Sequence, residues 1–306
     1  MPRLNLTSQR AIERLRKYTP PPTSYDSVPL SRRAAVLVLL YADRRGELRA
    51  VLTMRAKTLS SCRTDLISTG RADSLEESPF QTARREAEEE IGLPDISHQL
   101  PRPFTVEHLC EFPANLARTE LVVRPCVALL HSFDETTGEN ADPEVSLIPK
   151  LDAREVAAVF TAPFHNFLRA GDEEDWGGNP KDWYKGAWTE WHQSNWRMHQ
   201  FFVPIRPKDV VKPKARNEDQ RQAVNQLEEQ EKSSKVIRYR VFGMTARMLV
   251  DVARVAYAEE PEFEHNSHFG DETMIAQLRK MGRLSPIRRR GDQLTRADME
   301  TAAKLS

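Results

Sequence analysis

The chain has 306 residues, 39% hydrophobic and 29% charged, which allows one large domain or two small ones with a sizeable core. Lysine plus arginine and aspartate plus glutamate both number 45, so the overall charge gives no field that favours nucleic acid or an anionic membrane. The longest apolar run, residues 34–42, is far shorter than the roughly 20 residues of a membrane-spanning helix, so we expect no membrane span.

The first segment, residues 1–31, is predicted to form a short helix followed by an extended arm. The helix is expected over 8–17, where Ile12 and Leu15 face inward. The stretch 19–29 is rich in proline, which is typical of a linker or an extended arm.

The next part of the chain alternates strand-like stretches with two strong helical patterns. The helices are expected at 79–91 and 245–257, where apolar residues recur on one helical face. Because strands outnumber helices, the pattern indicates a mixed sheet packed between helices, an α/β/α sandwich. The predicted strands are 34–42, 48–54, 105–112, 121–130, 155–160, 198–203 and 236–242.

Residues 206–235 are polar, mixed in charge and nearly free of large apolar side chains. This composition is typical of a disordered or loosely helical insertion. A solvated insertion is favoured over a nucleic-acid role because its acidic residues dilute the basic ones. We therefore predict a domain at 32–260 that contains this insertion, followed by a C-terminal tail at 261–306.

The helix expected at 79–91 has clear start and stop signals. Ser78 and Gln81 fit a capping box, and Pro79 fits the first helical turn. Gly92 is the residue type that commonly ends a helix. These signals fix the length of the helix and therefore which of its side chains share a face.

Three glutamates, Glu86, Glu89 and Glu90, fall together beside the apolar face of this helix, near its C-terminal end. That end is already negative, and like charges four residues apart repel, so the arrangement costs free energy. Divalent cations such as Mg²⁺ take carboxylate oxygens together with substrate phosphates. A solvated acidic face is the alternative, but the convergence of the glutamates and the preceding Arg85 favour a metal site.

The stretch REAEEEIGL, residues 85–93, resembles the second half of the Nudix box. Gly70 and Glu77 fit its first half, and the spacer between them is one residue longer than the general pattern, which resembles the coenzyme A diphosphatase branch. The resemblance implies the α/β/α sandwich of Nudix enzymes. These enzymes hydrolyse a diphosphate that links a nucleoside to another group.

The resemblance also implies roles for individual residues. Glu86, Glu89 and Glu90 match the ligands of a Mg²⁺ or Mn²⁺ cofactor, Arg85 matches the residue that orients them, and Glu77 matches a supporting carboxylate. Such ions neutralise diphosphate oxygens and lower the pKa of a bound water. We expect Glu86, Glu89 and Arg85 to serve catalysis, but the sequence does not say which glutamate is the base.

Substrate-binding residues are predicted in the stretch just before the Nudix box and at the start of the box. The stretch LTMRAKTLSS, 52–61, resembles the leader of the coenzyme A subfamily, so Arg55 and Lys57 are candidates to hold phosphates, together with Gly70. Glu155 is either a metal ligand from a loop or a surface charge. The resemblance to fungal-type coenzyme A diphosphatases extends over roughly residues 32–275.

The stretch DLISTGRAD departs from the subfamily, because Ser68 and Thr69 stand where a proline and a glycine are usual. Glycines in such a loop adopt positive φ and let the backbone approach phosphate, and a β-branched residue does this poorly. We expect a reshaped loop, a weakened activity, or a misread gene-model junction.

Three functions follow from these patterns. The first is hydrolysis of coenzyme A or acyl-CoA to (acyl-)4′-phosphopantetheine and adenosine 3′,5′-bisphosphate. The second is the same chemistry on NADH, ADP-ribose or an oxidised nucleotide, and the third is a catalytically weak binding domain. The expected partner is a small-molecule substrate and not nucleic acid, and the oligomeric state is not predicted.

The cellular location is predicted from cysteine usage and from the resemblance. Cys62, Cys110 and Cys126 are widely spaced, which indicates a reducing compartment with neither disulfides nor a zinc site. The resemblance implies a peroxisomal protein, and a cytoplasmic one is the alternative.

Overall fold

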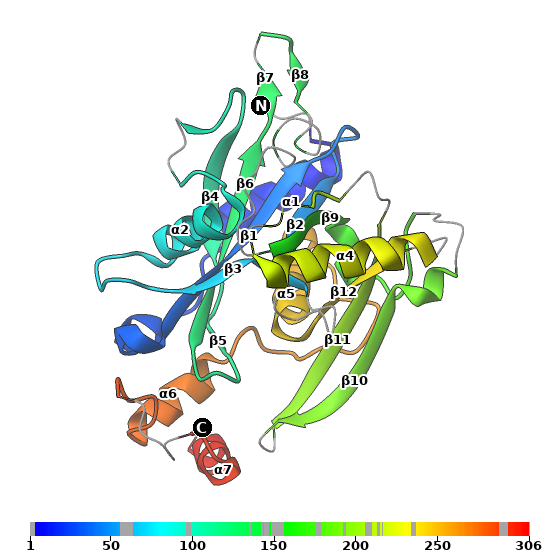
Figure 1. Ribbon diagram of the computed structural model, residues 1–306. Helices are drawn as coiled ribbons and strands as arrows, with labels where there is room; N and C mark the ends of the chain where they lie inside the picture. The colour runs from blue at the N-terminus through cyan, green and yellow to red at the C-terminus, as the bar shows by residue number, and fades with distance from the viewer. Residues whose placement is uncertain are drawn as a thin grey trace.

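The computed structural model has one large mixed sheet with helices on both faces (Figure 1). In the described part of the chain, no helix combines the length and the hydrophobicity that a membrane span requires. The described residues are 4–55, 64–95, 99–134, 136–141, 143, 147, 156–174, 179–191, 194–205, 210–212, 215, 217–233, 237–287 and 293–305.

The secondary structure follows the expected alternation of strands and helices. The helices are α1 (Leu6–Lys17), α2 (Pro79–Ile91), α4 (Glu218–Ser233), α5 (Gly243–Tyr257), α6 (Glu272–Lys280) and α7 (Arg296–Lys304). The strands are β1 (Arg33–Ala42), β2 (Leu48–Arg55), β3 (Thr64–Arg71), β4 (Thr105–Glu111), β5 (Asn115–Leu116), β6 (Val122–His131), β7 (Phe133–Asp134), β8 (Glu139–Asn140), β9 (Val156–Pro163), β10 (Tyr184–Trp191), β11 (Ser194–Ile205) and β12 (Ile237–Phe242).

The main sheet is mixed, as the sequence predicts. Its order is β10-β11-β12-β3-β2-β1-β6-β4, with β5 on β6 and β9 on β2. The β1–β6 and β12–β3 pairs are parallel and the other pairs are antiparallel. Strands β7 and β8 form a separate hairpin.

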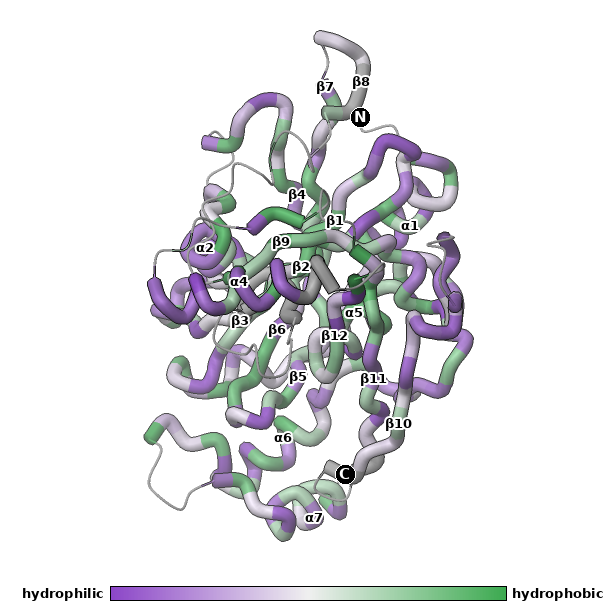
Figure 2. Tube along the Cα trace, turned by 45° about the vertical axis from the view of Figure 1, so that its right-hand side comes forward, coloured by the Kyte–Doolittle hydropathy of each residue, from purple (hydrophilic) through white to green (hydrophobic). Residues whose placement is uncertain are grey.

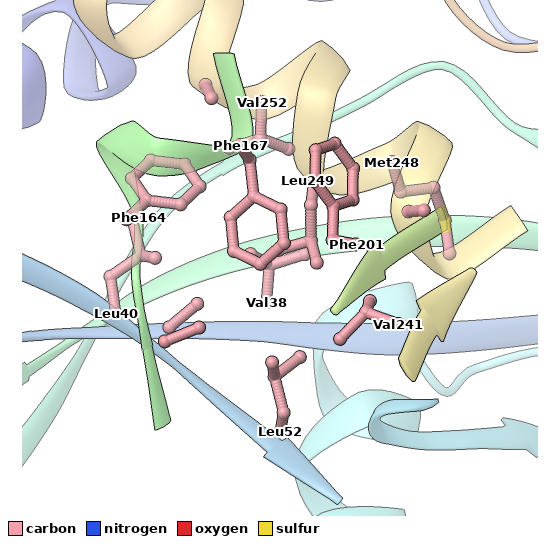
Figure 3. Close-up of a cluster of buried hydrophobic side chains, with 14 of the residues drawn as sticks. Val38, Leu40, Leu52, Phe164, Phe167, Phe201, Val241, Met248, Leu249 and Val252 are labelled. Atoms are coloured by element: carbon pink, nitrogen blue, oxygen red, sulfur yellow. The ribbon is translucent and has the colours of Figure 1, made fainter. Parts of the chain in front are cut away.

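Strand β1 separates the two halves of the core. Its side chains alternate between two hydrophobic clusters because successive residues of a strand point to opposite faces. On one face, Val38 and Leu40 meet Leu249 of α5 and the rings of Phe164 and Phe167 (Figure 3). Both faces of β1 are therefore buried, which explains why its sequence is almost continuously apolar.

Helices α1 and α5 cover that first face together. Ile12 and Leu15 of α1 are fully buried in the same cluster as α5. The Nη1 of Arg14 donates a hydrogen bond of 2.9 Å to the carbonyl of Ala256, in the last turn of α5. The chain's first helix is therefore attached to a helix that lies more than two hundred residues later.

Helix α2 covers the opposite face. Ala83, Ala87 and Ile91 are fully buried against β1 and β3. Helix α4 occupies part of the predicted polar insertion and is largely hydrophilic in Figure 2. Ala223 and Leu227 are its buried apolar contacts with the first core cluster.

The C-terminal helices α6 and α7 belong to a third cluster, which includes Tyr25 and Val28 of the arm. Carboxylates attach this segment to the sheet: Asp271 accepts from Leu116 N at 2.9 Å, and Glu272 accepts from Ala114 N at 2.8 Å. The region expected as a tail thus contains folded helices. The boundaries of the three predicted segments stay predictions.

The loop expected at residues 65–73 was predicted wrongly, because most of it lies in strand β3. Thr69 pairs with Val36 and Ile67 pairs with Leu37, so Ser68 is the additional residue of a β-bulge. The extended backbone at Thr69 suits a β-branched residue. Strand β10 and helices α6 and α7 were also not predicted.

Candidate active site

Helix α2 begins and ends as its sequence predicts. Ser78 Oγ accepts from Gln81 N at 3.2 Å, and Gln81 Oε1 accepts from Ser78 N at 2.8 Å, which completes the capping box. Gly92 ends the helix at φ +68°, a left-handed conformation that glycine adopts without strain. The two caps fix the position of the glutamates relative to strand β3.

Arg85 is the centre of the polar contacts on this helix. Its Nε donates to Glu77 Oε1 at 2.9 Å, and its Nη1 donates to Glu86 at 3.0 Å and Glu89 at 3.2 Å. Its Nη2 donates to the carbonyl of Arg71 at 2.7 Å, at the end of β3. The hydrogen bonds that Arg85 donates to these carboxylates, the one to Glu77 first, raise the pKa of Arg85. We call Arg85, Glu77, Glu86 and Glu89 the Arg85 cluster.

Glu77 connects the preceding loop to the helix. Its Oε2 accepts from Asp73 N at 2.9 Å, while its Oε1 receives the hydrogen bond from Arg85. Burial raises the pKa of Glu77, but the hydrogen bonds from Arg85 and the Asp73 backbone lower it by more, so the net shift is downward. Glu77 is therefore ionised at neutral pH and holds Arg85 in place.

Gly70 makes room for Glu86. A Cβ atom at position 70 would lie 1.6 Å from the carboxyl carbon of Glu86 and 1.9 Å from its Oε1. The Glu86 carboxylate therefore lies directly against the backbone of β3, and its side chain is only 16% exposed. Glycine is needed here for close approach.

The three predicted metal ligands differ in their surroundings. Glu86 and Glu89 contact the same Nη1 of Arg85, and the side chain of Glu89 is 56% exposed. Glu90 is buried, with 4% exposed. Among the described residues, no three His, Cys, Asp or Glu side chains are already arranged as a metal site. The donor set still fits Mg²⁺ or Mn²⁺ chemically, because carboxylate oxygens are the ligands these ions prefer.

Two predicted residues, and the side chain of a third, lie outside what the structure describes. Arg55 ends strand β2, but its side chain is not described, and Lys57 and Glu155 lie in undescribed stretches. Their predicted roles stay predictions. Gly70 is described, and it contacts Glu86.

A pocket of about 730 Å³ beside α2 was not predicted from the sequence. Its walls come from the loop after β3 and from the first turns of α2, including Asp73, Glu76 and Phe80. The Phe80 ring stacks on His108 at 4.1 Å, and burial lowers the pKa of that histidine. The acidic residues between Gly70 and the helix were the signal that could have indicated this pocket.

The site thus combines a mixed sheet with a capped helix whose glutamates gather on one arginine. The sequence model described as "NUDIX domain" matches residues 31–184, just over half of the chain. The chain belongs to the NUDIX family. Nudix hydrolases act on nucleoside diphosphate derivatives and generally use divalent ions such as Mg²⁺ or Mn²⁺.

Two relatives are similar over most of the chain, and a solved structure is similar over less than half of it. Peroxisomal coenzyme A diphosphatase 1 of Saccharomyces cerevisiae is 28% identical over 90% of this chain and 85% of its own length. Nudix hydrolase 22, chloroplastic, of Arabidopsis thaliana is 28% identical over 84% of this chain and 66% of its own length. A crystal structure of a C. elegans Ap4A hydrolase binary complex is 16% identical, covering 44% of this chain and 83% of that one, with a TM-score of 0.31.

Proposed function

We propose that this Nudix hydrolase cleaves the diphosphate bond of coenzyme A or acyl-CoA in a reaction that requires Mg²⁺ or Mn²⁺. Water adds across the P–O–P bridge, and the products are (acyl-)4′-phosphopantetheine and adenosine 3′,5′-bisphosphate. The observation that carries the proposal is the Arg85 cluster, set against Gly70 at the end of β3. The similarity to a coenzyme A diphosphatase over 90% of the chain supports the choice of substrate.

The glutamates of α2 are the proposed metal ligands. Glu86, Glu89 and Glu90 would hold the ion, which supplies charge neutralisation for the diphosphate and a more acidic water when bound. Glu86 is held against β3 and by Arg85, so its position is fixed before substrate arrives. The Glu89 side chain is 56% exposed, and its Oε1 accepts from Arg85 at 3.2 Å. Because it is exposed, it can turn without disturbing the core.

Arg85 and Glu77 are proposed as positioning residues. Arg85 holds Glu86 and Glu89 at one end of its guanidinium and Glu77 at the other. It thereby offsets the repulsion between carboxylates that are crowded at the negative end of a helix. One of the α2 glutamates takes the proton of the attacking water. Arg55 and Lys57 are the proposed phosphate-binding residues.

A product assay tests the proposal directly. Purified protein is incubated with coenzyme A and Mg²⁺, and the products are separated and identified. We expect both named products, and we expect Glu89→Gln to lose most of the turnover. Glu88→Gln is the matched control, because Glu88 is on the same helix but accepts from Asp95 N instead of contacting Arg85. Absence of both products, or equal loss in the two variants, would contradict the proposal.

A substrate panel tests the choice of coenzyme A over other nucleoside diphosphate derivatives. The value of kcat/KM for coenzyme A is compared with those for NADH and ADP-ribose, because specificity is a ratio of these constants. We expect coenzyme A to be preferred. A higher kcat/KM for another member of the panel would replace coenzyme A and leave the diphosphatase chemistry intact.

We also propose a peroxisomal location, supported by the location in the name of the yeast relative. A fluorescent fusion, with the fluorophore at the N-terminus so that the C-terminal residues stay accessible, is expected to co-localise with a peroxisomal marker. Diffuse cytoplasmic fluorescence would contradict it.

A further inference from the structure

The segment between α5 and α6, residues 258–271, is attached to the rest of the protein through two histidines, and we call it the strap. Figure 1 shows the strap as the orange trace that leaves α5 and passes strand β11 on its way to α6. His165 contacts the beginning of the strap, and His265, which belongs to the strap, anchors its middle. The side chain of His165 is 24% exposed and that of His265 is 3% exposed, so the two contacts differ in their access to water.

Both ring nitrogens of His165 face carboxylates. The Nδ1 atom lies 2.9 Å from Oε1 of Glu173, and the Nε2 atom lies 3.1 Å from Oε2 of Glu259 in the strap. A neutral imidazole has one N–H and can donate to only one of these carboxylates, whereas an imidazolium donates to both. The geometry therefore fits the protonated ring. In agreement, the hydrogen bond to Glu173 is the largest of the causes that raise the pKa of His165, while partial burial opposes it.

Arg169 gives the neutral ring an alternative partner. Its Nη2 lies 3.1 Å from Oε2 of Glu259 and 3.2 Å from Nε2 of His165. When the ring loses the Nε2 proton, that nitrogen becomes an acceptor and competes with Glu259 for the guanidinium. Loss of the proton thus removes one donor from Glu259 and draws away a second, while Nδ1–H of His165 still donates to Glu173. The contact that weakens is the one to the strap.

The other charged or titratable groups around the ring favour its protonated form. The ring of Tyr257, at the end of α5, lies 4.4 Å from that of His165, and burial raises the pKa of its phenol, so Tyr257 stays neutral. Glu262 of the strap lies 3.2 Å from Nη1 of Arg169, and Glu47, before β2, is close enough to act on Tyr257. The surrounding carboxylates therefore outnumber the one arginine.

The second histidine contact does not need a proton gained near neutral pH. Nε2 of His265 lies 2.8 Å from Oδ1 of Asp251, and its Nδ1 lies 2.8 Å from Nε2 of His199. Nδ1 of His199 in turn lies 3.0 Å from the hydroxyl of Tyr184. Burial lowers the pKa of His199 to about 2, so this ring is neutral and offers one N–H and one acceptor nitrogen. The middle of the strap therefore stays attached where His165 titrates.

We infer that His165 is a pH-operated clamp, which holds residues 258–262 of the strap when its ring is protonated and releases them when the ring is neutral. Because the pKa of His165 is raised by the fold, the clamp's contribution is complete below the unfolded pKa of about 6.5 and is lost as pH rises through the higher, folded pKa. The release is local, since His265 still anchors the strap. It concerns the motion of the strap and does not depend on the proposed hydrolysis.

Two measurements on the wild-type protein test the clamp. The first is an NMR titration of the His165 ring, for which we expect a midpoint above about 6.5. The second is amide hydrogen exchange at about pH 6 and about pH 9, expressed as protection factors so that the faster intrinsic exchange in base cancels. Glu262 N donates to the carbonyl of Leu168 at 2.8 Å and reports on the clamped part, while Asp271 N donates to the carbonyl of Ala114 at 2.7 Å and reports on the far end. We expect the protection of Glu262 to fall severalfold at the higher pH and that of Asp271 to stay within about twofold.

Variants then assign the effect to His165. His165→Gln cannot titrate in this range, so we expect low protection at Glu262 that no longer changes with pH. Glu173→Gln removes the carboxylate that contacts Nδ1, and we expect the NMR midpoint of His165 to fall. His131→Gln is the matched control, because Nε2 of His131 also contacts a carboxylate, that of Glu107 at 2.7 Å, but at the end of β6. It should keep the wild-type pH dependence at Glu262.

Four outcomes would overturn the inference. These are a His165 midpoint at or below about 6.5, equal protection of Glu262 at the two pH values, the same pH dependence in His165→Gln as in the wild type, or an equal loss of protection at Asp271. The last result would mean that the whole strap opens and that His165 does not control its first residues alone. The wild-type measurements decide the question even if a variant does not fold.

Discussion

The contact between Gly70 and Glu86 makes the sharpest prediction. In Gly70→Ala the new methyl group would lie 1.6 Å from the Glu86 carboxyl carbon, so the carboxylate has to move. The atom it meets is the far end of a flexible side chain, and we therefore expect the fold to survive. The moved carboxylate loses its 3.0 Å hydrogen bond from Arg85.

The size of the effect follows from that lost contact. A hydrogen bond to a charged group contributes about 1.5–3 kcal/mol, and the partial exposure of both partners places the loss at the low end. We expect the Tm of Gly70→Ala to fall by a few degrees, on the order of 2–4 °C per kcal/mol. Displacing a proposed ligand should weaken the apparent Mg²⁺ affinity by about 10–100-fold.

Thermal melts and Mg²⁺ titrations of coenzyme A hydrolysis measure both effects. The control is a double-mutant cycle with Glu86→Ala, which removes the side chain that the methyl group meets. In the Glu86→Ala background, Gly70→Ala should then change Tm much less than it does alone. An equal fall in Tm in both backgrounds, or an unchanged Mg²⁺ dependence in Gly70→Ala, would refute the steric reasoning.

The remaining predictions concern the supports of α2. Arg85→Lys replaces the planar guanidinium, which contacts three carboxylates, by a single ammonium group, so kcat/KM for coenzyme A should fall about 100-fold. If the variant keeps more than half of the wild-type activity, Arg85 is not a positioning residue. Because the pKa of Glu77 is lowered on folding, its contribution to stability is complete above its unfolded pKa of about 4.3 and is lost as pH falls through the lower, folded pKa. The Tm difference between wild type and Glu77→Gln should therefore be largest near neutral pH and should shrink in acid. A constant Tm difference down to about pH 3 would show that the charge of the carboxylate does not stabilise the fold. Ser78→Ala removes one of the two hydrogen bonds of the capping box and should lower the free energy of unfolding, measured by urea denaturation, by about 1 kcal/mol. An unchanged urea midpoint would mean that the cap does not stabilise α2.

The sequence predicted α2 correctly because the features of a single helix depend on residues that are close together in the chain. The caps of α2, its buried face and the convergence of Glu86 and Glu89 depend on residues within one helix, and their spacing predicts them. Strand β3 depends on partners outside its own segment, because it pairs with β1 and β2, which precede it, and with β12 much later in the chain. A short polar stretch with a glycine resembles a loop until those partners are known.

The role of Gly70 shows the same limit within the candidate site. The Nudix motif predicts a glycine at this position, and we expected it to let the backbone approach a substrate phosphate. In the structure, the group that approaches the backbone at Gly70 is the carboxylate of Glu86. Helices α6 and α7 were missed for a related reason. Their apolar faces are short, and they pack on Tyr25 and Val28 of the arm, which the sequence separates from them by some 250 residues.

The attachment of α1 to α5 has a consequence for how the protein is made. During synthesis, the ribosome releases β1 early, with nearly every side chain apolar, while α5 emerges only after residue 257. Until then that face of the growing sheet lacks the cover of α5, and the nascent chain exposes apolar surface for many seconds at ordinary translation speeds. Holdase chaperones should therefore bind translating ribosomes that carry this chain, and release it once Arg14 can reach Ala256.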